Sequence, residues 1–400
     1  MGVKKIAIIV DSHIGSTLPL IRQFISFGYN VDYYILCCDK IGDREAINIK
    51  SSKTKLGIHP ITEEESPCIF SYISSINFRL YYFSTLRPYN SIFGLRHIIM
   101  TINKLLIKKI CKKINAENYF AINYVGRYNS EILMQIEKYI KCTNTITSLH
   151  EVCNHFYTNS TKPTKYLKYL FKNNKKIIVH SQKSYVDILK YSETNKDRIF
   201  HVNFGLFETY KTISEKNIKD LNVPYFLFYG FIQPYKGLNI LYDAINLLSV
   251  DELDEYKIVV AGRGYDPILE RMKNDNRFIV INRYISNAEI VKLNTNAKAI
   301  ICPYLTVSQS GIIQTSLVFE KPIIASNIGS FLEFLEHKKT GLLFECGNSE
   351  DLANSILTLK NDQILYDEIL RNIKKLEYIQ PNFSWLEIGK SYIKIFNTEY

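Results

Sequence analysis

The sequence lacks the marks of a disulfide framework and of a zinc site. Its eight cysteines are scattered, Cys37 and Cys38 are the only close pair, and no Cys-x-x-Cys spacing occurs. Paired spacings would indicate zinc binding or, in a short secreted chain, a set of disulfides. Since cytosolic thiols are kept reduced, the scattered pattern predicts a cytosolic chain with free thiols.

Long apolar runs are also missing. No run in the chain approaches the roughly 18 residues that a membrane-spanning helix needs. The short apolar core at residues 6–10 has no cleavage-like segment after it, which predicts a first β-strand and not a signal peptide. With 400 residues and 46% hydrophobic residues, the chain is long and apolar enough for two packed domains.

Acidic residues are absent from the window between residues 66 and 116, although the whole chain carries a net charge of +11. This window holds the basic residues Arg79, Arg87, Arg96, Lys104, Lys108, Lys109, Lys112 and Lys113. Aromatic residues interleave with them, at Phe70, Tyr72, Phe78, Tyr81, Tyr82, Phe83, Tyr89 and Phe93. A basic surface with aromatic side chains suits an anionic membrane, although nucleic-acid binding and an ordinary solvated basic face are the alternatives.

A second basic stretch lies at residues 162–176. It contains Lys162, Lys165, Lys168, Lys172, Lys175 and Lys176, with Tyr166, Tyr169 and Phe171 among them. We expect peripheral contact with the anionic inner face of a membrane through residues 66–116 and 162–176. We expect no nucleic-acid partner, because nucleic-acid binding would leave the glycine loops of the second half without a role.

Apolar runs of strand length alternate with segments of helix length. The first series lies at residues 5–10, 31–36, 120–123, 145–149, 176–179 and 199–202. A second series follows at residues 225–229, 257–261, 278–281, 298–301, 322–325 and 341–344. Such alternation is typical of doubly wound parallel sheets. Because it occurs twice, with a polar join near residues 212–222, we predict an α/β chain of two Rossmann-like domains, residues 1–215 and 222–382, facing across a cleft.

Two loops of the second half have the composition of phosphate sites. In the first, Gly230 and Gly237 allow a tight turn, and Lys236 is presented near a helix N-terminus as a point charge for phosphate. The alternative for this loop is a turn with a solvated lysine. In the second, Ser-Gln-Ser-Gly at residues 308–311 lies between a strand and a helix, where free backbone N–H groups favour an anion. Ser310 could also cap that helix.

The order of these elements resembles the donor-binding domain of retaining GT-B glycosyltransferases of family 4, the group 1 type. The resemblance rests on Gly-x5-Lys-Gly at residues 230–237, Ala261-Gly262, Arg283-Tyr284-Ile285, Pro303-Tyr304, Lys-Pro-Ile-Ile-Ala-Ser-x-x-Gly at residues 321–329 and Thr340-Gly341. The first half is similar more loosely, through Gly15 and through Ser148-Leu149-His150-Glu151. The resemblance implies a GT-B fold in which a last helix, residues 383–400, packs back on the first, acceptor-side domain.

The resemblance also implies an activity and a site. The donor is a nucleoside-diphosphate sugar, and side chains and helix dipoles stabilise its leaving diphosphate, so we expect no metal and no other cofactor. The donor-binding residues implied are Gly15, Gln233, Lys236, Arg283, Tyr284, Ser308, Gln309, Ser310, Gly311, Ile312, Thr315 and Ser316. The acceptor implied is a lipid-linked or surface polysaccharide glycan, as in capsule, O-antigen or exopolysaccharide synthesis, and the chain is expected in the cytoplasm at the inner face of the membrane.

His150 and Glu151 are the expected catalytic residues, beside the reacting sugar. An imidazole can donate or accept a proton near neutral pH, although a core or surface histidine is the plain alternative. A metal site at His150, Glu151, Cys153 and His155 is disfavoured, because the two histidines are one residue further apart than in the helical zinc motif.

The sequence departs from the family pattern at several positions. Many members carry two glutamates around the last loop, where this chain has Ser308 and either Thr315 or Ser316. The family's arginine near Lys236 is absent, and Glu320 stands where glycine is usual. The Ser-Gln-Ser-Gly form resembles a branch that lacks these glutamates. The alternatives are a non-catalytic partner subunit of a glycosyltransferase and a GT-B sugar-nucleotide 2-epimerase.

Overall fold

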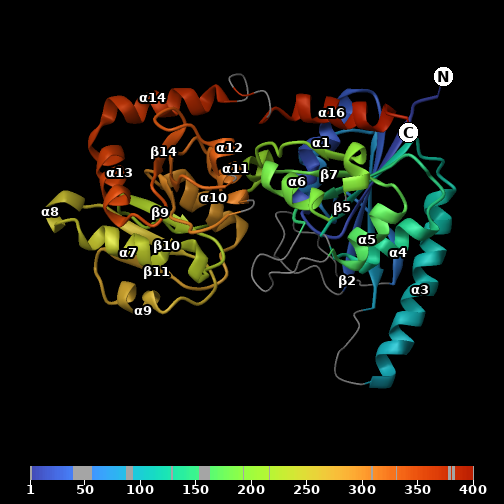
Figure 1. Ribbon diagram of the computed structural model, residues 1–400, viewed down its shortest axis with the longest axis horizontal. Coiled ribbons are helices and arrows are strands. Elements are labelled where there is room, and N and C mark those ends of the chain that lie inside the picture. The colour runs from blue at the N-terminus through green and yellow to red at the C-terminus, as the bar shows by residue number, and fades with distance from the viewer. Residues whose placement is uncertain are drawn as a thin grey trace. The chain divides into compact units, whose positions relative to one another are not determined.

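The computed structural model describes residues 2–38, 56–86, 93–127, 129–152, 163–191, 193–215, 217–307, 310–329, 331–376, 380 and 383–399. The chain divides into two compact units (Figure 1). Unit 1 comprises Met1–Phe204 together with Trp385–Tyr400, and unit 2 comprises Gly205–Ser384.

The boundaries differ from the predicted ones at both joins. Residues 205–215 belong to unit 2, because the backbone N–H of Phe207 donates to Gln314 O at 3.4 Å and the 3-10 helix η2 (Glu208–Thr212) contacts the helix that holds Gln314. Phe383 also belongs to unit 2, since its ring lies 4.9 Å from that of Phe334. The polar stretch at residues 212–222 is therefore a connection inside unit 2 and not the join itself.

Unit 1 is built on an eight-stranded sheet. Its strands are β1 (Lys5–Val10), β2 (Asn30–Cys38), β3 (Gly57–Ile61), β4 (Phe78–Thr85), β5 (Ala121–Gly126), β6 (Thr145–Leu149), β7 (Lys176–Val179) and β8 (Ile199–His201). The strand order is β3-β4-β2-β1-β5-β6-β7-β8, and every neighbouring pair is parallel except β3 and β4. The chain moves outward from β1 and then returns to β5 on the other side of β1, so the sheet has its switch point between β1 and β5.

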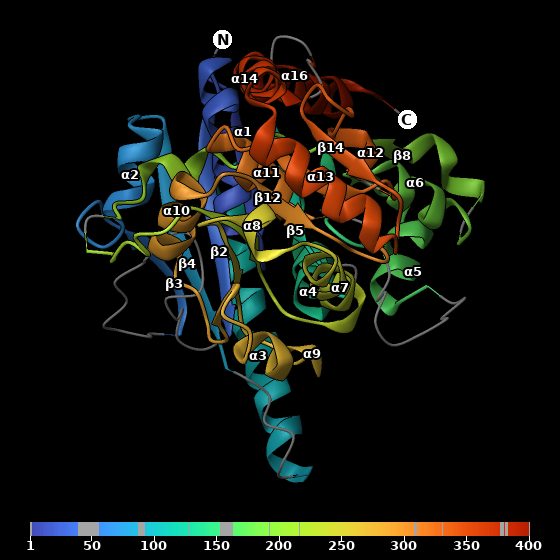
Figure 2. The same ribbon diagram turned by 90° about the vertical axis from the view of Figure 1, so that its left-hand side faces the viewer.

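The helices of unit 1 cover both faces of this sheet (Figures 1 and 2). They are α1 (Ile14–Ser26), α2 (Pro67–Ile73), α3 (Phe93–Asn115), α4 (Glu131–Tyr139), α5 (Lys165–Lys172), α6 (Gln182–Leu189), η1 (Glu193–Arg198) and α16 (Trp385–Asn397). Ser130, Thr164 and Ser181 cap α4, α5 and α6, because each side chain accepts a hydrogen bond from a backbone N–H three residues on.

The last helix, α16, packs on α1. A side chain in place of Gly389 would come within 2.8 Å of Gln23 Cβ, so only glycine allows this close approach. The Lys176 ammonium donates to the terminal carbonyls of α16, to Ile395 O at 2.9 Å and to Thr398 O at 2.8 Å. A cation at the C-terminus of a helix stabilises the free carbonyl groups there, and so the end of the chain is held on unit 1.

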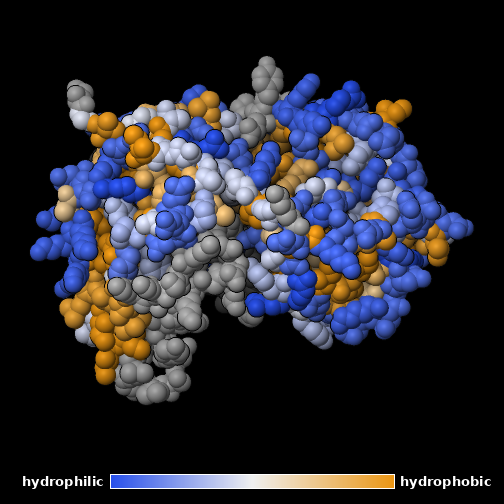
Figure 3. All heavy atoms as spheres, turned by 180° about the vertical axis from the view of Figure 1, so that it is seen from behind, coloured by the Kyte–Doolittle hydropathy of each residue, from blue (hydrophilic) through white to orange (hydrophobic). Residues whose placement is uncertain are grey.

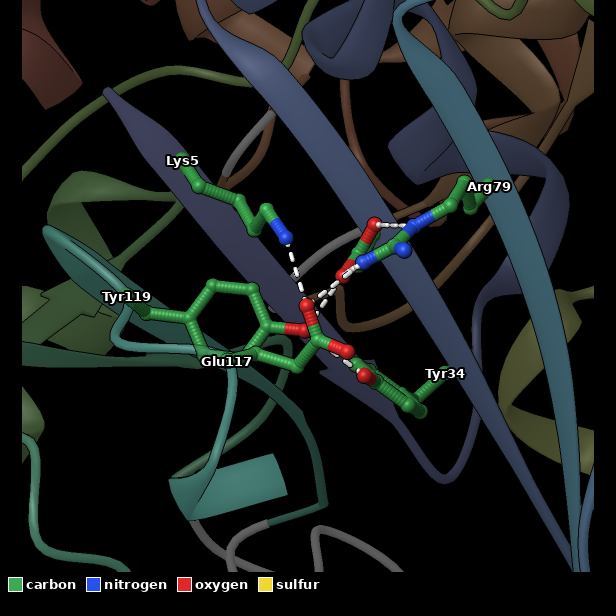
Figure 4. Close-up of polar contacts among 6 residues, drawn as sticks. Lys5, Tyr34, Arg79, Glu117 and Tyr119 are labelled. Carbon is green, nitrogen blue, oxygen red and sulfur yellow. Dashed lines mark hydrogen bonds and ion pairs between the residues drawn. The ribbon is translucent and has the colours of Figure 1, made fainter. Parts of the chain in front are cut away.

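A polar cluster joins the amino-terminal ends of the central strands of unit 1 (Figure 4). The buried carboxylate of Asp32 accepts a bidentate pair from Arg79, at 2.7 and 2.6 Å, and a hydrogen bond from Tyr119. Glu117 accepts from Arg79 at 2.8 Å and from Lys5 at 2.6 Å. Both carboxylates are thus paired with cations, as a buried charge requires. Arg79 is therefore not one of the cations that unit 1 could present to a membrane.

Unit 2 contains a six-stranded sheet that is parallel throughout. Its strands are β9 (Tyr225–Tyr229), β10 (Lys257–Ala261), β11 (Phe278–Ile281), β12 (Ile300–Cys302), β13 (Ile323–Ser326) and β14 (Gly341–Phe344). The order is β11-β10-β9-β12-β13-β14, with the switch point between β9 and β12. The strands read as nearly continuous apolar runs, because helices cover a parallel sheet on both faces.

The helices of unit 2 connect these strands. They are η3 (Pro234–Lys236), α7 (Leu238–Asn246), α8 (Val250–Leu253), α9 (Ile268–Lys273), α10 (Asn287–Asn296), α11 (Gly311–Val318), α12 (Phe331–Phe334), α13 (Ser349–Asn361) and α14 (Gln363–Lys374). Glu320 follows α11 with φ 56°, in the left-handed region that favours glycine. This conformation explains why glycine is usual at the position. Among the helices of the described residues, none has the length and apolarity of a membrane span.

Candidate active site

The loop after β9 lies at the switch point of unit 2. Gly230 (φ 118°) ends the strand, and Gly237 (φ 68°) stands immediately before α7. A Cβ on Gly237 would lie 1.8 Å from Pro303 O, in the segment that follows β12. Glycine is therefore required at this position both for its backbone angle and for its contact, and it holds the ends of β9 and β12 together.

Lys236 projects into this junction as a buried cation. Its side chain is only 7% exposed, and its Nζ lies 4.9 Å from the ring centroid of Tyr304. Within the described residues the ammonium has neither a hydrogen bond nor an ion pair. Burial lowers the pKa of Lys236 to about 8, so the group is still mostly protonated at pH 7. A desolvated cation held in this way favours a bound anion.

The first turn of α11 approaches the same glycine as Lys236. A Cβ on Gly230 would lie 3.1 Å from Lys236 Nζ and 3.1 Å from Ile312 Cδ1. Ser310 is the N-cap residue of α11, but its side chain makes no capping hydrogen bond. The alternative interpretation, in which the Ser310 side chain caps α11, is therefore not supported. The N-terminus of α11 and Lys236 Nζ together form a positive site at the switch point.

Gly311 makes a close contact within unit 2. A Cβ at this position would lie 2.8 Å from Cε2 of Phe207. The absence of a side chain at Gly311 thus allows the close packing of Phe207 on α11, whether or not a phosphate approaches the helix. Ser308 and Gln309, also expected in this loop, lie outside the described residues.

The hydroxyls of Thr315 and Ser316 are occupied inside unit 2. Thr315 Oγ1 donates to Gly311 O at 2.8 Å. Ser316 Oγ donates to Asn294 Oδ1 at 3.1 Å and lies 3.2 Å from Tyr229 OH. Both residues are buried. These side chains stabilise α11 and its packing, and the structure does not turn their hydroxyls toward Lys236.

The other predicted donor residues of unit 2 are Arg283, Tyr284 and Gln233. Arg283 and Tyr284 follow the edge strand β11, which β10 separates from β9. Arg283 forms a bidentate pair with Glu289, at 2.5 and 3.2 Å, so its charge is already compensated. Tyr284 is 41% exposed. Gln233 is half-buried at the start of η3 and does not cap it.

Unit 1 gathers three histidines at the carboxyl ends of its strands. His13 follows β1, His150 follows β6 and His180 follows β7. His150 and His180 are buried, with 4% and 2% exposure, whereas His13 is exposed. The rings of His13 and His150 stack with centroids 3.5 Å apart and planes 13° apart. His180 lies 5.2 Å from His150, centroid to centroid. The predicted catalytic residue is thus one member of a cluster.

Burial keeps the imidazoles of His150 and His180 neutral. It lowers the pKa of His180 to about 3 and that of His150 well below its ordinary value. His180 Nδ1 lies 2.9 Å from Val202 O. Since a carbonyl only accepts, Nδ1 carries the proton and Nε2 of His180 is an acceptor. In the part of the chain that the structure describes, Nε2 of His150 and of His180 have no hydrogen-bond partner, so both remain able to bind a ligand.

The remaining predicted residues of unit 1 differ in burial. Gly15 is buried in the first turn of α1, two residues after His13. Glu151 is exposed. Cys153 and His155 lie outside the described residues, and the described residues contain no group of three or more His, Cys, Asp or Glu that could hold a metal ion.

Sequence reasoning did not identify His13 or Tyr304 as parts of these sites. His13 adopts φ 60° at the N-cap of α1, a conformation that only a few non-glycine residues adopt. The signal for His13 in the sequence was its position in the loop that follows β1, at the switch point of the sheet. Tyr304 follows β12 and is buried beneath Lys236, and its role depends on a contact across the chain that no local pattern encodes.

Comparison with known proteins supports one class of fold. Residues 209–376 match the family model described as "Glycosyl transferases group 1". The chain is 26% identical over 253 residues to "Uncharacterized glycosyltransferase MJ1178" of Methanocaldococcus jannaschii, and the match covers 60% of this chain. The chain spans 64% of the length of that relative.

The solved structures cover nearly the whole chain. Anabaena Alr3699/HepE in complex with UDP and glucose is 16% identical with a TM-score of 0.62, over 98% of both chains. A glycosyltransferase from Rickettsia africae ESF-5 is 16% identical with a TM-score of 0.63, over 98% of this chain and 97% of that one. At such identities the likeness shows the fold, which is GT-B, with two parallel-sheet α/β domains.

Proposed function

We propose that the protein is a metal-independent, retaining glycosyltransferase of the family 4 type, which moves a sugar from a nucleoside-diphosphate sugar to an acceptor hydroxyl. The observation that carries this proposal is the buried Lys236, which has no anionic partner among the described residues and lies beside the uncapped start of α11. The match of residues 209–376 to the group 1 glycosyl transferases supports it.

The site of unit 2 suits a leaving diphosphate. Negative charge develops on the diphosphate as the bond to the sugar breaks, and preorganised donors stabilise that charge most when water is excluded. Lys236 supplies a full positive charge, and the N–H groups of Ser310, Gly311 and Ile312 supply a helix N-terminus. Gln233 lies in the same loop as Lys236, and we include it among the residues that bind the diphosphate. We place Thr315 and Ser316 behind this site, as residues that hold α11.

The site of unit 1 suits the reacting sugar or the acceptor. His150 is neutral at pH 7, so it can accept a proton or a hydrogen bond from a hydroxyl group but cannot act as a cationic acid. His13 stacks on His150 and fixes the plane of its ring. Gly15 lies in the same turn, and Glu151 supplies an exposed carboxylate next to His150.

We further propose a glycan on a lipid carrier as acceptor, as in surface polysaccharide synthesis, and peripheral attachment to an anionic membrane. Exposed lysines on α3 and α5 support this attachment. Four aromatic residues of the window 66–116, Tyr72, Phe78, Tyr82 and Phe83, do not, because they are buried in unit 1. Their alternation with other residues reflects the strand β4 and the helix α2.

One observation favours a second candidate function, a non-catalytic partner subunit. The positions of the family's two glutamates hold Ser308 and Thr315 or Ser316, and Thr315 and Ser316 use their hydroxyls within the protein. Such a subunit would leave the Lys236 site without a ligand.

A thermal-shift panel tests the proposal. It compares UDP, GDP, ADP, CDP and their sugars, with and without EDTA, on the wild type and on Lys236→Met. Lys339→Met serves as the matched control, because Lys339 is an exposed lysine of the same unit that pairs only with Glu336. One nucleotide should raise Tm with and without EDTA, in the wild type and the control but not in Lys236→Met.

Two results would count against the proposal. If no nucleotide raises Tm, the partner-subunit reading gains, and the next step is to look for a chain that copurifies. If the same nucleotide stabilises Lys236→Met as much as the wild type, the nucleotide binds elsewhere and the assignment of the diphosphate site fails.

A further inference from the structure

Helix α3 projects beyond the sheet of unit 1. In both ribbon views its Phe93 end stands away from the strands, while its Asn115 end lies against the unit (Figures 1 and 2). The anchoring face is apolar, with Ile107, Ile110, Cys111 and Ile114 buried. These residues recur at the spacing of one helix face, so the second half of α3 is packed. In the first half Ile99 is also buried, and the exposed side chains lie on the other faces.

The projecting half carries apolar side chains on its solvent face. Ile98 is 57% exposed, Ile102 is 37% exposed and Leu105 is 62% exposed. Their spacing of four and three residues places them in one stripe along the helix. Met100, 43% exposed, lies on the other side of the helix. Figure 3 shows apolar side chains gathered at this end of α3. Single exposed apolar residues are common, but a contiguous patch marks an interaction surface.

Lysines continue the stripe toward the body of unit 1. Lys109 and Lys112 lie on the same side of the helix as Leu105, and Lys104, Lys108 and Lys113 flank them. All five are exposed, and α3 contains no acidic residue. The solvent face of α3 is therefore apolar at its projecting end and basic behind it.

The basic surface extends over two further helices. Asn115 Nδ2 donates to Tyr139 O at 2.9 Å, which joins α3 to α4. Tyr166 donates to Glu137, which joins α4 to α5. On α5 the exposed residues are Lys165, Lys168 and Lys172, and Lys138 of α4 lies over the ring of Tyr169. The two basic stretches of the sequence thus meet on one surface of unit 1, where Glu131 at the start of α4 is an exposed acid.

We propose that the projecting end of α3 inserts Ile98, Ile102 and Leu105 into the headgroup and acyl boundary of an anionic bilayer, while the lysines of α3 and α5 bind lipid phosphates. The inference rests on the membrane contact proposed above and assigns it to one element. It also predicts two components of binding, since charge attraction is screened by salt and apolar insertion is not.

Charge selects the bilayer over a second copy of the chain. If two copies paired through α3, the lysines of one helix would lie next to those of the other. Since α3 carries no acidic residue, these like charges would repel each other. An anionic lipid surface offers phosphates to the lysines and an apolar layer to the stripe at the same time.

Vesicle sedimentation tests the proposal on the full chain. Vesicles of phosphatidylcholine alone and with one third phosphatidylglycerol are compared from low to high salt. The wild type should bind the anionic vesicles and keep part of this binding at high salt. Ile98→Ser with Leu105→Ser should lower the salt-resistant binding by roughly tenfold or more, from the loss of two buried apolar side chains. Lys108→Gln with Lys112→Gln should instead weaken low-salt binding.

Ile364→Ser is the control, because Ile364 is 81% exposed in unit 2 and lies off this surface. A second readout comes from Leu105→Trp. The chain has one tryptophan, which is buried, so the new indole should shift its emission to the blue and be quenched by brominated acyl chains when vesicles are added.

Three results would overturn the inference. The serine variants could bind like the wild type at every salt concentration, or Leu105→Trp could show no quenching by brominated lipid. The third is a dimer in solution that the serine variants dissociate, which would make α3 an interface between copies. Nucleotide binding is measured separately. A failure of membrane insertion would therefore leave the transferase proposal standing, and a failure of nucleotide binding would leave the membrane inference standing.

Discussion

The carboxyl-terminal edges of the two sheets share an architecture and differ in chemistry. At the edge of unit 2 a buried lysine lies beside a helix N-terminus, with no anionic partner among the described residues. At the edge of unit 1 burial keeps His150 and His180 neutral, and the ring of His13 stacks on that of His150. The first edge favours an anion, and the second offers hydrogen-bonding nitrogens without charge. In the proposed transferase, the first edge would bind the leaving diphosphate and the second the hydroxyl group.

The opposite edge of the sheet of unit 1 makes the contrast sharper. There Asp32 and Glu117 are paired with Arg79 and Lys5 (Figure 4). Paired charges stabilise the start of the strands. The unpaired groups occur where the strands end, which is where parallel α/β sheets bind ligands.

The largest expected effect concerns acid stability of the histidine edge. The pKa of the buried His180 falls to about 3 on folding, so below pH 6.5 this residue binds more protons in the unfolded chain than in the folded chain. It then lowers the free energy of unfolding by up to about 1.4 kcal/mol per pH unit as pH falls. Glu137, whose pKa burial raises to about 7, acts in the opposite sense and offsets part of this.

His180→Gln isolates that contribution. The difference in free energy of unfolding between pH 7 and pH 5, measured with urea, should shrink by roughly 2 kcal/mol in the variant. His97→Gln, at an exposed position of the same unit, should leave the difference unchanged. A pH dependence that His180→Gln does not alter would show that this imidazole is charged in the folded protein.

Lys236→Met should stabilise the ligand-free protein. Burial lowers the pKa of Lys236 from 10.5 to about 8, so the folded state opposes protonation. That cost is fully present below pH 8 and is relieved as pH rises toward 10.5. The variant should gain on the order of 1–3 kcal/mol in free energy of unfolding at pH 7 and less at pH 10. A loss of stability at pH 7 would mean that Lys236 has an anionic partner in the resting protein.

The smallest effect is expected at Glu320, away from both edges. Its φ of 56° is costly for any residue except glycine, and its contact with Lys374 is an exposed ion pair at 3.5 Å. Such a pair contributes little. Glu320→Gly should therefore raise the free energy of unfolding by about 1 kcal/mol and leave nucleotide binding unchanged. A decrease in the free energy of unfolding would show that loss of the ion pair, or the greater conformational freedom of glycine in the unfolded chain, outweighs the relief of strain.

The sequence predicted most of the core strands, because each is a short apolar run between turn residues. Residues 5–10, 225–229 and 257–261 were predicted as they are found in β1, β9 and β10. The strands β3 and β4 were missed, β4 because Arg79 and its aromatic neighbours were interpreted as a basic surface. Only the partner across the sheet, Asp32, reveals that the charge of Arg79 is paired.

The candidate site could be predicted in part. Lys236 and His150 lie in segments that follow strands, and the ends of these strands can be recognised in the sequence. Other features depend on contacts between distant segments. Gly311 meets Phe207, and His150 meets His13. The hydroxyls of Thr315 and Ser316 have partners that the order of residues does not disclose.

The most direct measurement of the division between the two edges is calorimetric titration of the matching nucleotide into Lys236→Met and His150→Asn, with sugar transfer assayed on the same samples. We expect Lys236→Met to lose affinity by roughly tenfold or more, as for a hydrogen bond to a charged group. His150→Asn should bind the nucleotide like the wild type and lose transfer by roughly a hundredfold or more. If His150→Asn lost nucleotide affinity while Lys236→Met kept it, the assignment of the diphosphate to unit 2 and of the hydroxyl to unit 1 would be contradicted.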